Sequence, residues 1–215
     1  MTKPISLAIL VSGNGSNLQA IIDAIESGQL NAEIKAVVSN NPEAYGLVRA
    51  TRHNLHTRVI DDQDYKDREH YDEVLRHYLE TIGPDYIVLA GFMRILSPGF
   101  IDAFEHRILN IHPSLLPAYK GLNTYQRALD NAESRHGVSI HLVTAELDAG
   151  PIILQASYAV EAGDRVEYLQ SRGIQLEHQM FPQVLSWLSD KRLTIKEGQV
   201  FYDQALLEQP IQFDH

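Results

Sequence analysis

The first half of the chain alternates short apolar runs with longer segments whose apolar residues recur at helical spacing. The apolar runs, each predicted to be a strand, cover residues 6–11, 34–38, 58–60 and 86–90. The segments between them, each predicted to be a helix, cover residues 18–25, 44–54 and 68–82. Strands that are joined through helices run parallel and are covered on both faces. We therefore expect an α/β fold, with a mostly parallel twisted sheet and helices on both faces.

The second half no longer follows this rhythm. Predicted strands cover residues 108–111, 138–143 and 152–160, and predicted helices cover 125–131 and 166–188. The long helix leads to a hairpin of 193–196 and 200–202, and the last dozen residues are predicted to be irregular. Residues 83–84 and 97–99 are predicted to be turns. Because no linker interrupts the pattern, we expect one domain over 1–215, with an N-terminal lobe of about 1–100 and a C-terminal lobe of about 101–195.

Composition excludes several classes of protein. No apolar run reaches the ~18 residues of a membrane helix, and the first residues lack the pattern of a signal peptide. We therefore expect a cytoplasmic protein without membrane partners. The net charge of −10 and the absence of a basic cluster argue against nucleic acid as a partner. The chain has no cysteine, which excludes disulfides, a thiolate nucleophile and cysteine-ligated zinc.

A glycine-rich loop, Ser12-Gly13-Asn14-Gly15-Ser16-Asn17, lies between the first predicted strand and helix. Glycines allow close backbone approach, and the start of a helix attracts anions through its free N–H groups. Dinucleotide binding is disfavoured because Leu18 stands where the third glycine of that pattern belongs, and no acid ends the second strand. We therefore predict a mononucleotide phosphate site and no NAD. A tight turn with a Ser or Asn helix cap is the alternative.

Three polar residues of the second half have the chemistry of an acyl-transfer site. Asn110 and His112 lie two apart on a strand that Pro113 ends, so both side chains share one face at its carboxyl end. Asp148 follows a later strand in a Gly-Pro turn, where we expect an exposed carboxylate. An amide and an imidazolium suit the oxyanion of a tetrahedral intermediate, and a nearby carboxylate favours the imidazolium.

Spacing alone leaves other roles open for these residues. A histidine at a strand end often bonds only to backbone, and an aspartate before glycine is often a turn residue. A zinc site of His112, His141 and Asp148 is a further alternative, although the chain lacks the His-Glu-x-x-His pattern. We expect no metal.

Several motifs together resemble the folate-dependent glycinamide ribonucleotide formyltransferase family. The matching stretches are residues 11–21, 89–96, 110–117, 146–151 and Glu177-His178. The run Asn-x-His-Pro-Ser-Leu-Leu-Pro is typical of formyltransferases in general, and the glycine loop narrows the resemblance to this family. The similarity runs from about residue 6 to about 193, which is nearly the whole chain.

The resemblance implies a Rossmann-like formyltransferase fold and transfer of a formyl group from 10-formyltetrahydrofolate, as cosubstrate, to the primary amine of glycinamide ribonucleotide in purine synthesis. It implies nucleotide-phosphate binding in the N-terminal lobe, and catalysis and folate binding in the C-terminal lobe. The catalytic residues would be Asn110, His112 and Asp148, with His141 supporting them. The ribonucleotide would be bound by Gly15, Ser16, Asn17 and Glu177. The folate would be bound by Arg68, Met93, Arg94, Ile95, Leu96, Asn110, Thr144, Ala145, Glu146, Leu147 and Asp148.

Each residue outside the catalytic trio also has a simpler reading. Met93, Ile95 and Leu96 could belong to the core, whereas Arg68 and Glu177 could be exposed helix residues. His141 could equally be a structural histidine whose hydrogen bonds are satisfied within the fold. Many relatives carry histidine where this chain has Asn123 or Tyr125, and Ala118 replaces a common lysine, which puts the closing contacts of this loop in doubt. Gly173 lies inside a predicted helix and weakens the prediction there.

Other functions compete with this one. Formyltetrahydrofolate hydrolase carries an additional N-terminal domain, for which we expect no room, and methionyl-tRNA formyltransferase carries a basic C-terminal domain. A nucleotide-binding module without catalysis would need only the glycine loop. We expect small-molecule substrates and a monomer or a homodimer.

Overall fold

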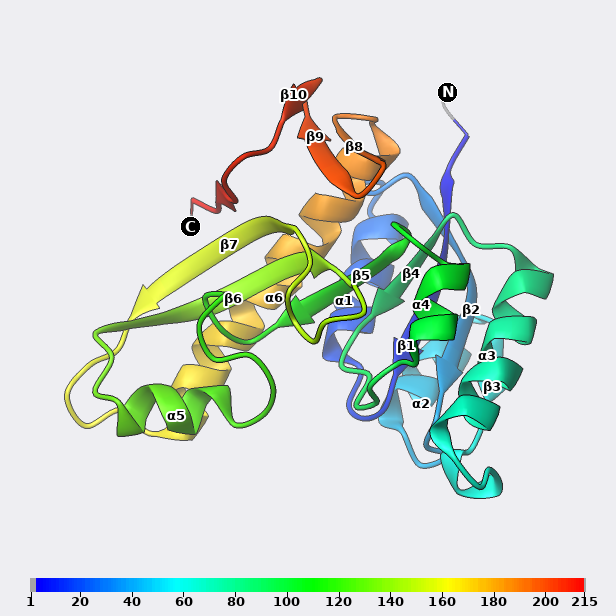
Figure 1. The fold of residues 1–215 in the computed structure, drawn as a ribbon, viewed down its shortest axis with the longest axis horizontal. Helices are drawn as coiled ribbons and strands as arrows, with labels where there is room; N and C mark the ends of the chain where they lie inside the picture. Colours follow the sequence, from blue (N-terminus) through cyan, green and yellow to red (C-terminus); the bar gives the residue numbers. More distant parts are fainter. Residues whose placement is uncertain (1–2, 215) are drawn as a thin grey trace.

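The computed structural model describes residues 3–214, and its centre is an eight-stranded sheet (Figure 1). The strand order is β11-β7-β6-β5-β4-β1-β2-β3. The strands are β1 (Ile5–Val11), β2 (Ala32–Ser39), β3 (Thr57–Val59), β4 (Tyr86–Leu89), β5 (Ile108–His112), β6 (Arg135–Leu142), β7 (Ile152–Ala159) and β11 (Ile211–Gln212). Strands β1 to β5 pair in parallel, whereas β6 runs antiparallel to both β5 and β7.

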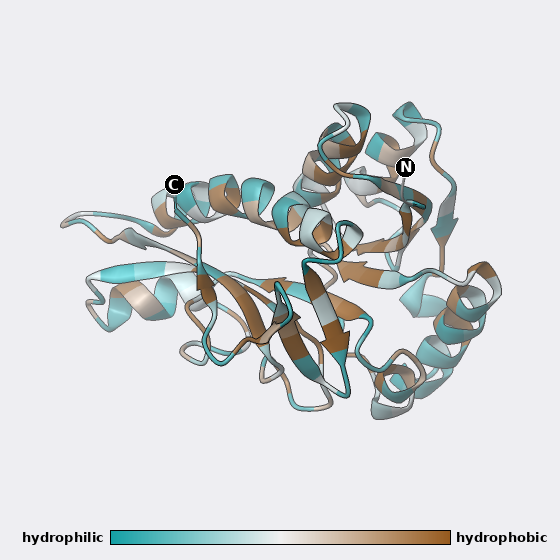
Figure 2. Cartoon of the chain, turned by 90° about the horizontal axis from the view of Figure 1, so that it is seen from above, coloured by the Kyte–Doolittle hydropathy of each residue, from teal (hydrophilic) through white to brown (hydrophobic). Residues whose placement is uncertain are grey.

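Helices cover both faces of this sheet, which confirms the predicted fold class. They are α1 (Ser16–Glu26), α2 (Tyr45–Arg52), the 3-10 turn η1 (Asp62–Asp64), α3 (Arg68–Ile82), α4 (Pro98–Ala103), α5 (Thr124–Asp130) and α6 (Val166–Ser189). Alternate residues of β1 belong to two cores, because successive side chains of a strand point to opposite faces. Leu7 and Ile9 pack with α1 and α6, whereas Ala8 and Leu10 pack with α3 and α4. Much of the sheet has the brown colour of hydrophobic residues (Figure 2).

The predicted terminal hairpin is present as β8 (Leu193–Lys196) and β9 (Gln199–Tyr202). The short strand β10 (Ala205–Leu206) joins them in a separate antiparallel sheet. The prediction that the last dozen residues are irregular is wrong, because β10 lies there and β11 pairs in parallel with β7 at the edge of the large sheet. Two residues of β11 are too short a segment to show any strand periodicity.

Helix α4 was also missed, since the sequence Ser97-Pro98-Gly99 was interpreted only as a turn. The side chain of Ser97 accepts a hydrogen bond from the backbone N–H of Phe100, and Pro98 occupies the first helical turn. Both features are typical of a helix start. Gly173, by contrast, does not interrupt α6, which is continuous over its 24 residues.

Candidate active site

A pocket of about 410 Å³ lies where the carboxyl ends of β1, β4 and β5 meet. In parallel α/β sheets, ligands bind outside these ends. The residues that line the pocket are Ser12, Gly13, Asn14, Gly15, Ser16, Asn17, Ala90, Gly91, Met93, Ile111, Pro113, Tyr125, Gln170, Ile174 and Glu177. Tertiary structure therefore brings the predicted glycine loop next to the strand that carries Asn110 and His112.

The glycine loop is held from behind by α2. Gly15 has a left-handed backbone, with φ of 71°, and a Cβ there would lie 2.6 Å from the Cα of Gly46. The N–H of Gly46 donates to the carbonyl of Gly13 at 3.0 Å. Arg49 donates from Nε to the carbonyl of Asn14 at 2.9 Å and from Nη2 to its Oδ1 at 3.0 Å. Ser16 and Asn17, the first residues of α1, line the pocket, and the N–H groups of a first helical turn have no partner inside the helix.

Glu177 of α6 is joined to the glycine loop rather than exposed. Its side chain is buried, and its Oε2 accepts a hydrogen bond from Nδ2 of Asn17 at 2.7 Å. Burial raises the pKa of Glu177, and the hydrogen bond from Asn17 opposes that rise. The side-chain amide of Asn17 is thus engaged with Glu177, so an anion at this loop would meet the backbone N–H groups of α1.

The three candidate catalytic residues converge. Nδ1 of His112 lies 3.4 Å from Oδ2 of Asp148, and each of these side chains is 8% exposed. The carboxylate is therefore buried, and the expectation that it is exposed is wrong. Asp148 has a left-handed backbone, with φ of 47°, and its Oδ2 also accepts a hydrogen bond from the N–H of Gly121 at 2.9 Å. These contacts turn the carboxylate inward.

His141 pairs with Asn110 across the neighbouring strands β5 and β6. Its Nδ1 faces the carbonyl of Leu142 at 2.8 Å, and a carbonyl only accepts, so this nitrogen carries the proton. Burial lowers the pKa of His141, which favours the neutral ring. The bare Nε2 then accepts from Nδ2 of Asn110 at 3.2 Å and lies 3.7 Å from Oδ1 of Asp148. The second N–H of the Asn110 amide remains available for a ligand.

A loop between β5 and α5 covers the trio. Nε2 of His112 donates to the carbonyl of Tyr119 at 2.9 Å, and Lys120 pairs with Glu146 at 2.9 Å. Both ring nitrogens of His112 therefore face oxygen acceptors, an arrangement that a doubly protonated ring satisfies fully. The zinc alternative gains no support, since residues 3–214 contain no group of three or more potential ligands placed to hold a metal ion.

Comparison with known proteins identifies the family. The model of the family described as formyl transferase matches residues 5–185. The chain belongs to the formyl transferase family. This membership confirms the resemblance seen in the motifs.

Individual members of the family are similar over nearly their whole length. A phosphoribosylglycinamide formyltransferase from Escherichia coli is 46% identical over 92% of this chain and 93% of its own. One from Haemophilus influenzae is 43% identical over 94% and 95%. The structure of the phosphoribosylglycinamide formyltransferase from Coxiella burnetii superimposes with a TM-score of 0.93 at 45% identity, covering 98% of this chain and 100% of that one.

The apolar residues that are predicted to bind the folate differ in their exposure in this formyl transferase. Met93, Ile95 and Leu147 are largely exposed, with 72%, 58% and 48% of their surface accessible, so they are not core residues. Leu96 is buried and packs in the core, in line with its simpler reading. Exposed apolar side chains beside a candidate site are of the kind that contact an apolar ligand.

The polar residues predicted for the folate make contacts of their own. Arg94 forms an ion pair with Asp62 at 2.7 Å and lies over the ring of Tyr71, whereas Arg68 pairs with its neighbour Glu69 at 3.2 Å. The hydroxyl group of Thr144 donates to the carbonyl of Glu146 at 3.3 Å. Ala145 is exposed in the same segment.

Sequence reasoning missed the residues that support the formyl transferase site from a distance. Arg49 holds the glycine loop from α2, and Asn40 links Ser12 to Asp62 through its side-chain amide. The hydroxyl of Ser12 in turn accepts a hydrogen bond from the N–H of Met93 at 2.8 Å. These partners lie 22 to 81 positions apart, so no local pattern could have revealed them.

Among residues 3–214, none of the helices combines the length and the apolar character that a membrane span needs.

Proposed function

We propose that this formyl transferase moves the formyl group of 10-formyltetrahydrofolate to the primary amine of glycinamide ribonucleotide, a step of purine synthesis. The observation that carries the proposal is the placement of the glycine loop and the trio of Asn110, His112 and Asp148 at the carboxyl ends of β1 and β5, which flank β4 in the sheet. Two relatives that are 46% and 43% identical over 93% and 95% of their own lengths bear the name phosphoribosylglycinamide formyltransferase. The ribonucleotide phosphate would bind at Gly15, Ser16 and Asn17, through the N–H groups of α1.

The chemistry proceeds by direct attack. The amine nitrogen of the ribonucleotide forms a bond to the formyl carbon, and the carbonyl oxygen becomes an oxyanion. The free N–H of Asn110 and the Nε2–H of His112 stabilise that oxyanion. The bond to N10 of the folate then breaks, and the proton lost by the amine ends on N10. Asp148 holds the imidazolium through Nδ1 and assists this transfer.

The loop over the site must give way for this step. Nε2 of His112 bonds to the carbonyl of Tyr119, so the loop has to release His112 before that nitrogen can reach an oxyanion. The folate would lie against the exposed side chains of Met93, Ile95 and Leu147 and bond to the backbone of residues 93–96 and 144–148. The side chain of Arg94 is engaged with Asp62, so it would contribute its backbone. We further propose a cytoplasmic enzyme with only small-molecule substrates, active as a monomer or homodimer.

One assay tests this function. The purified protein is incubated with both substrates, and tetrahydrofolate and the formylated amide are measured in parallel. We expect equal amounts of the two products and no folate turnover when the ribonucleotide is omitted. Undiminished folate turnover in water alone would favour a hydrolase. Intact nucleotide binding without any turnover would favour a binding module.

A further inference from the structure

Tyr125 is a pocket residue to which no role has yet been assigned. It lies in the first turn of α5 and lines the pocket together with the glycine loop and Glu177. Its ring is held edge-on by His136, with ring centroids 5.3 Å apart and planes at 68°. Nε2 of His136 bonds in turn to the carbonyl of Pro113 at 3.0 Å. The ring is therefore fixed, while its hydroxyl group makes no hydrogen bond to any residue within 3–214.

Gly173 of α6 provides the space for this hydroxyl group. A Cβ at Gly173 would lie 2.7 Å from Oη of Tyr125, but 3.4 and 3.5 Å from the two nearest ring carbons. The hydroxyl thus lies against the backbone of α6. Gly173 precedes Glu177 by four residues, one helical turn, so the two positions share a face of the helix. Glycine is less favourable than alanine in the middle of a helix, and the closeness of the Tyr125 hydroxyl explains why alanine would not fit at this position.

The Tyr125 hydroxyl and the Glu177 carboxylate offer complementary hydrogen bonding. Burial raises the pKa of Tyr125, and the charge of Glu177 adds to the rise, so the phenol stays protonated and donates. Oε2 of Glu177 already accepts from Asn17, which leaves Oε1 as an acceptor beside the pocket. A hydroxyl group that must both accept and donate, such as one on a furanose ring, matches this pair. The anion-binding start of α1 lines the same pocket.

We infer that Tyr125 positions the ribonucleotide by donating a hydrogen bond to a ribose hydroxyl group that itself donates to Glu177, and that Gly173 makes room for it. This inference rests on the proposed function, because it takes glycinamide ribonucleotide as the ligand of the pocket. Tyr125 acts on binding of that substrate and not on the transfer step, since the trio lies on β5 and the loop after β6.

The first test is Tyr125→Phe, which removes only the hydroxyl group. We expect the KM for the ribonucleotide to rise about three- to tenfold, the usual range for one lost hydrogen bond. The KM for 10-formyltetrahydrofolate and the kcat should stay within about twofold. A ribonucleotide analogue without the 2′- and 3′-hydroxyl groups should show the same KM with the wild type and with Tyr125→Phe. If Tyr125 had only a structural role, Tyr125→Phe would change the KM for both substrates or lower the melting temperature. The difference in KM between the variant and the wild type would then persist with the analogue.

A double-mutant cycle with Gly173→Ala makes the test sharper. The added Cβ displaces the hydroxyl group, so Gly173→Ala should raise the KM for the ribonucleotide about as much as Tyr125→Phe does. In the Tyr125→Phe background the clash is absent, and Gly173→Ala should add almost nothing. Additive effects, or an unchanged KM in Tyr125→Phe, would overturn the inference. Absence of turnover in the wild type would instead contradict the proposed function.

Discussion

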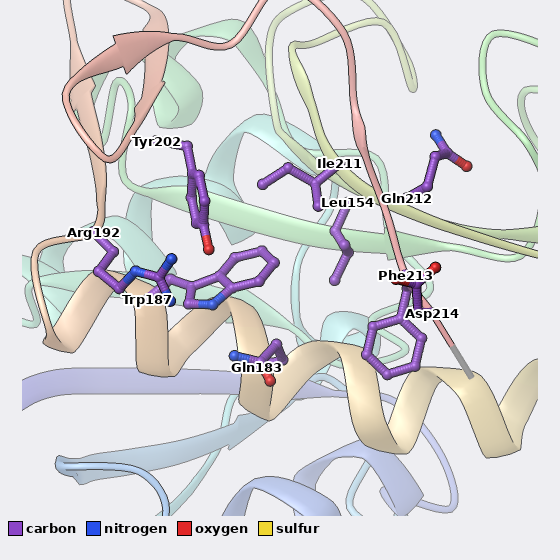
Figure 3. A pocket seen from close by; sticks show the side chains of 9 residues that line it. All are labelled: Leu154, Gln183, Trp187, Arg192, Tyr202, Ile211, Gln212, Phe213 and Asp214. Carbon is purple, nitrogen blue, oxygen red and sulfur yellow. The ribbon is translucent and has the colours of Figure 1, made fainter.

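Two concave regions within residues 3–214 lie along α6, and they differ in the features that a substrate site requires. The pocket at the sheet edge measures about 410 Å³. A second pocket of about 330 Å³ lies between α6, the β8–β9 hairpin and the C-terminal segment (Figure 3). Its lining residues are Leu154, Gln183, Trp187, Arg192, Tyr202, Ile211, Gln212, Phe213 and Asp214. The two pockets have similar volumes, so volume alone does not show which of them binds a substrate.

The difference lies in how the polar groups are used. In the second pocket Arg192 forms a bidentate pair with Asp203, at 3.0 and 2.7 Å, and lies over the ring of Tyr202. The rings of Trp187 and Tyr202 pack against each other at 4.9 Å. The first pocket is instead lined by the start of α1, by Tyr125 and by Glu177, whose Oε2 alone accepts from Asn17. Groups held in place without an internal partner are what a polar ligand requires.

The largest expected effect separates the two regions by activity. His112→Ala and Asp148→Asn should each lower kcat by about 100- to 1000-fold, because each weakens stabilisation of the oxyanion. Gln183→Ala in the second pocket is the matched control and should keep kcat. Steady-state kinetics and circular dichroism of the three variants check this, and near-normal rates in either trio variant would contradict the assigned roles.

The second prediction distinguishes the two pockets by their effect on the stability of the fold. Trp187→Ala should lower the free energy of unfolding by about 3 kcal/mol through the cavity it creates. That loss corresponds to a fall in melting temperature of about 6 to 12 °C for a domain of this size. The KM values and the kcat of the folded enzyme should not change. Altered substrate affinity in this variant would mean that the second pocket also serves the reaction.

The third prediction concerns the glycine loop. Gly15 and Gly28 have nearly equal φ values, 71° and 75°, but only Gly15 has a backbone neighbour, Gly46, in the way of a Cβ. Alanine at either position should cost about 1 kcal/mol for the left-handed backbone. Gly15→Ala should additionally raise the KM for the ribonucleotide, because Gly46 must move. Equal KM values for Gly15→Ala and Gly28→Ala would argue against a phosphate site at this loop.

The smallest expected effect is on the pH dependence of stability, which should have opposite signs for Glu177 and Asp203. The pKa of Glu177 is raised by burial, so its stabilising contribution is present below 4.5 and lost as pH rises through the folded-state pKa. The pKa of Asp203 is lowered by Arg192, so its contribution is present above 3.8 and lost as pH falls through the folded-state pKa. The free energy of unfolding in urea is measured from pH 3 to 8. As pH rises, the stability of Glu177→Gln should increase relative to the wild type, and that of Asp203→Asn should decrease relative to the wild type. Parallel curves for both variants would contradict this contrast.

Much of the fold could be predicted because it depends on local patterns. The alternation of apolar runs and helical segments predicts the parallel strands, and Pro113 predicts the end of β5. The failures were short or non-local elements. Helix α4 has only six residues, and β11 is a two-residue segment that pairs with β7 from a distant part of the chain. Neither is long enough for its periodicity to appear in the sequence.

For the site, the sequence by itself determined the chemical inventory: a glycine loop without the third glycine of a dinucleotide site, an amide and an imidazole on one strand, and a carboxylate on a later segment. Tertiary structure decided the partnerships. It buried Asp148 beside His112, and it joined Asn17 to Glu177 across 160 positions. It also placed Tyr125 against Gly173. The physical reason is that residue type sets what a side chain can donate or accept, whereas burial and long-range contacts decide which of those groups stay free for a ligand.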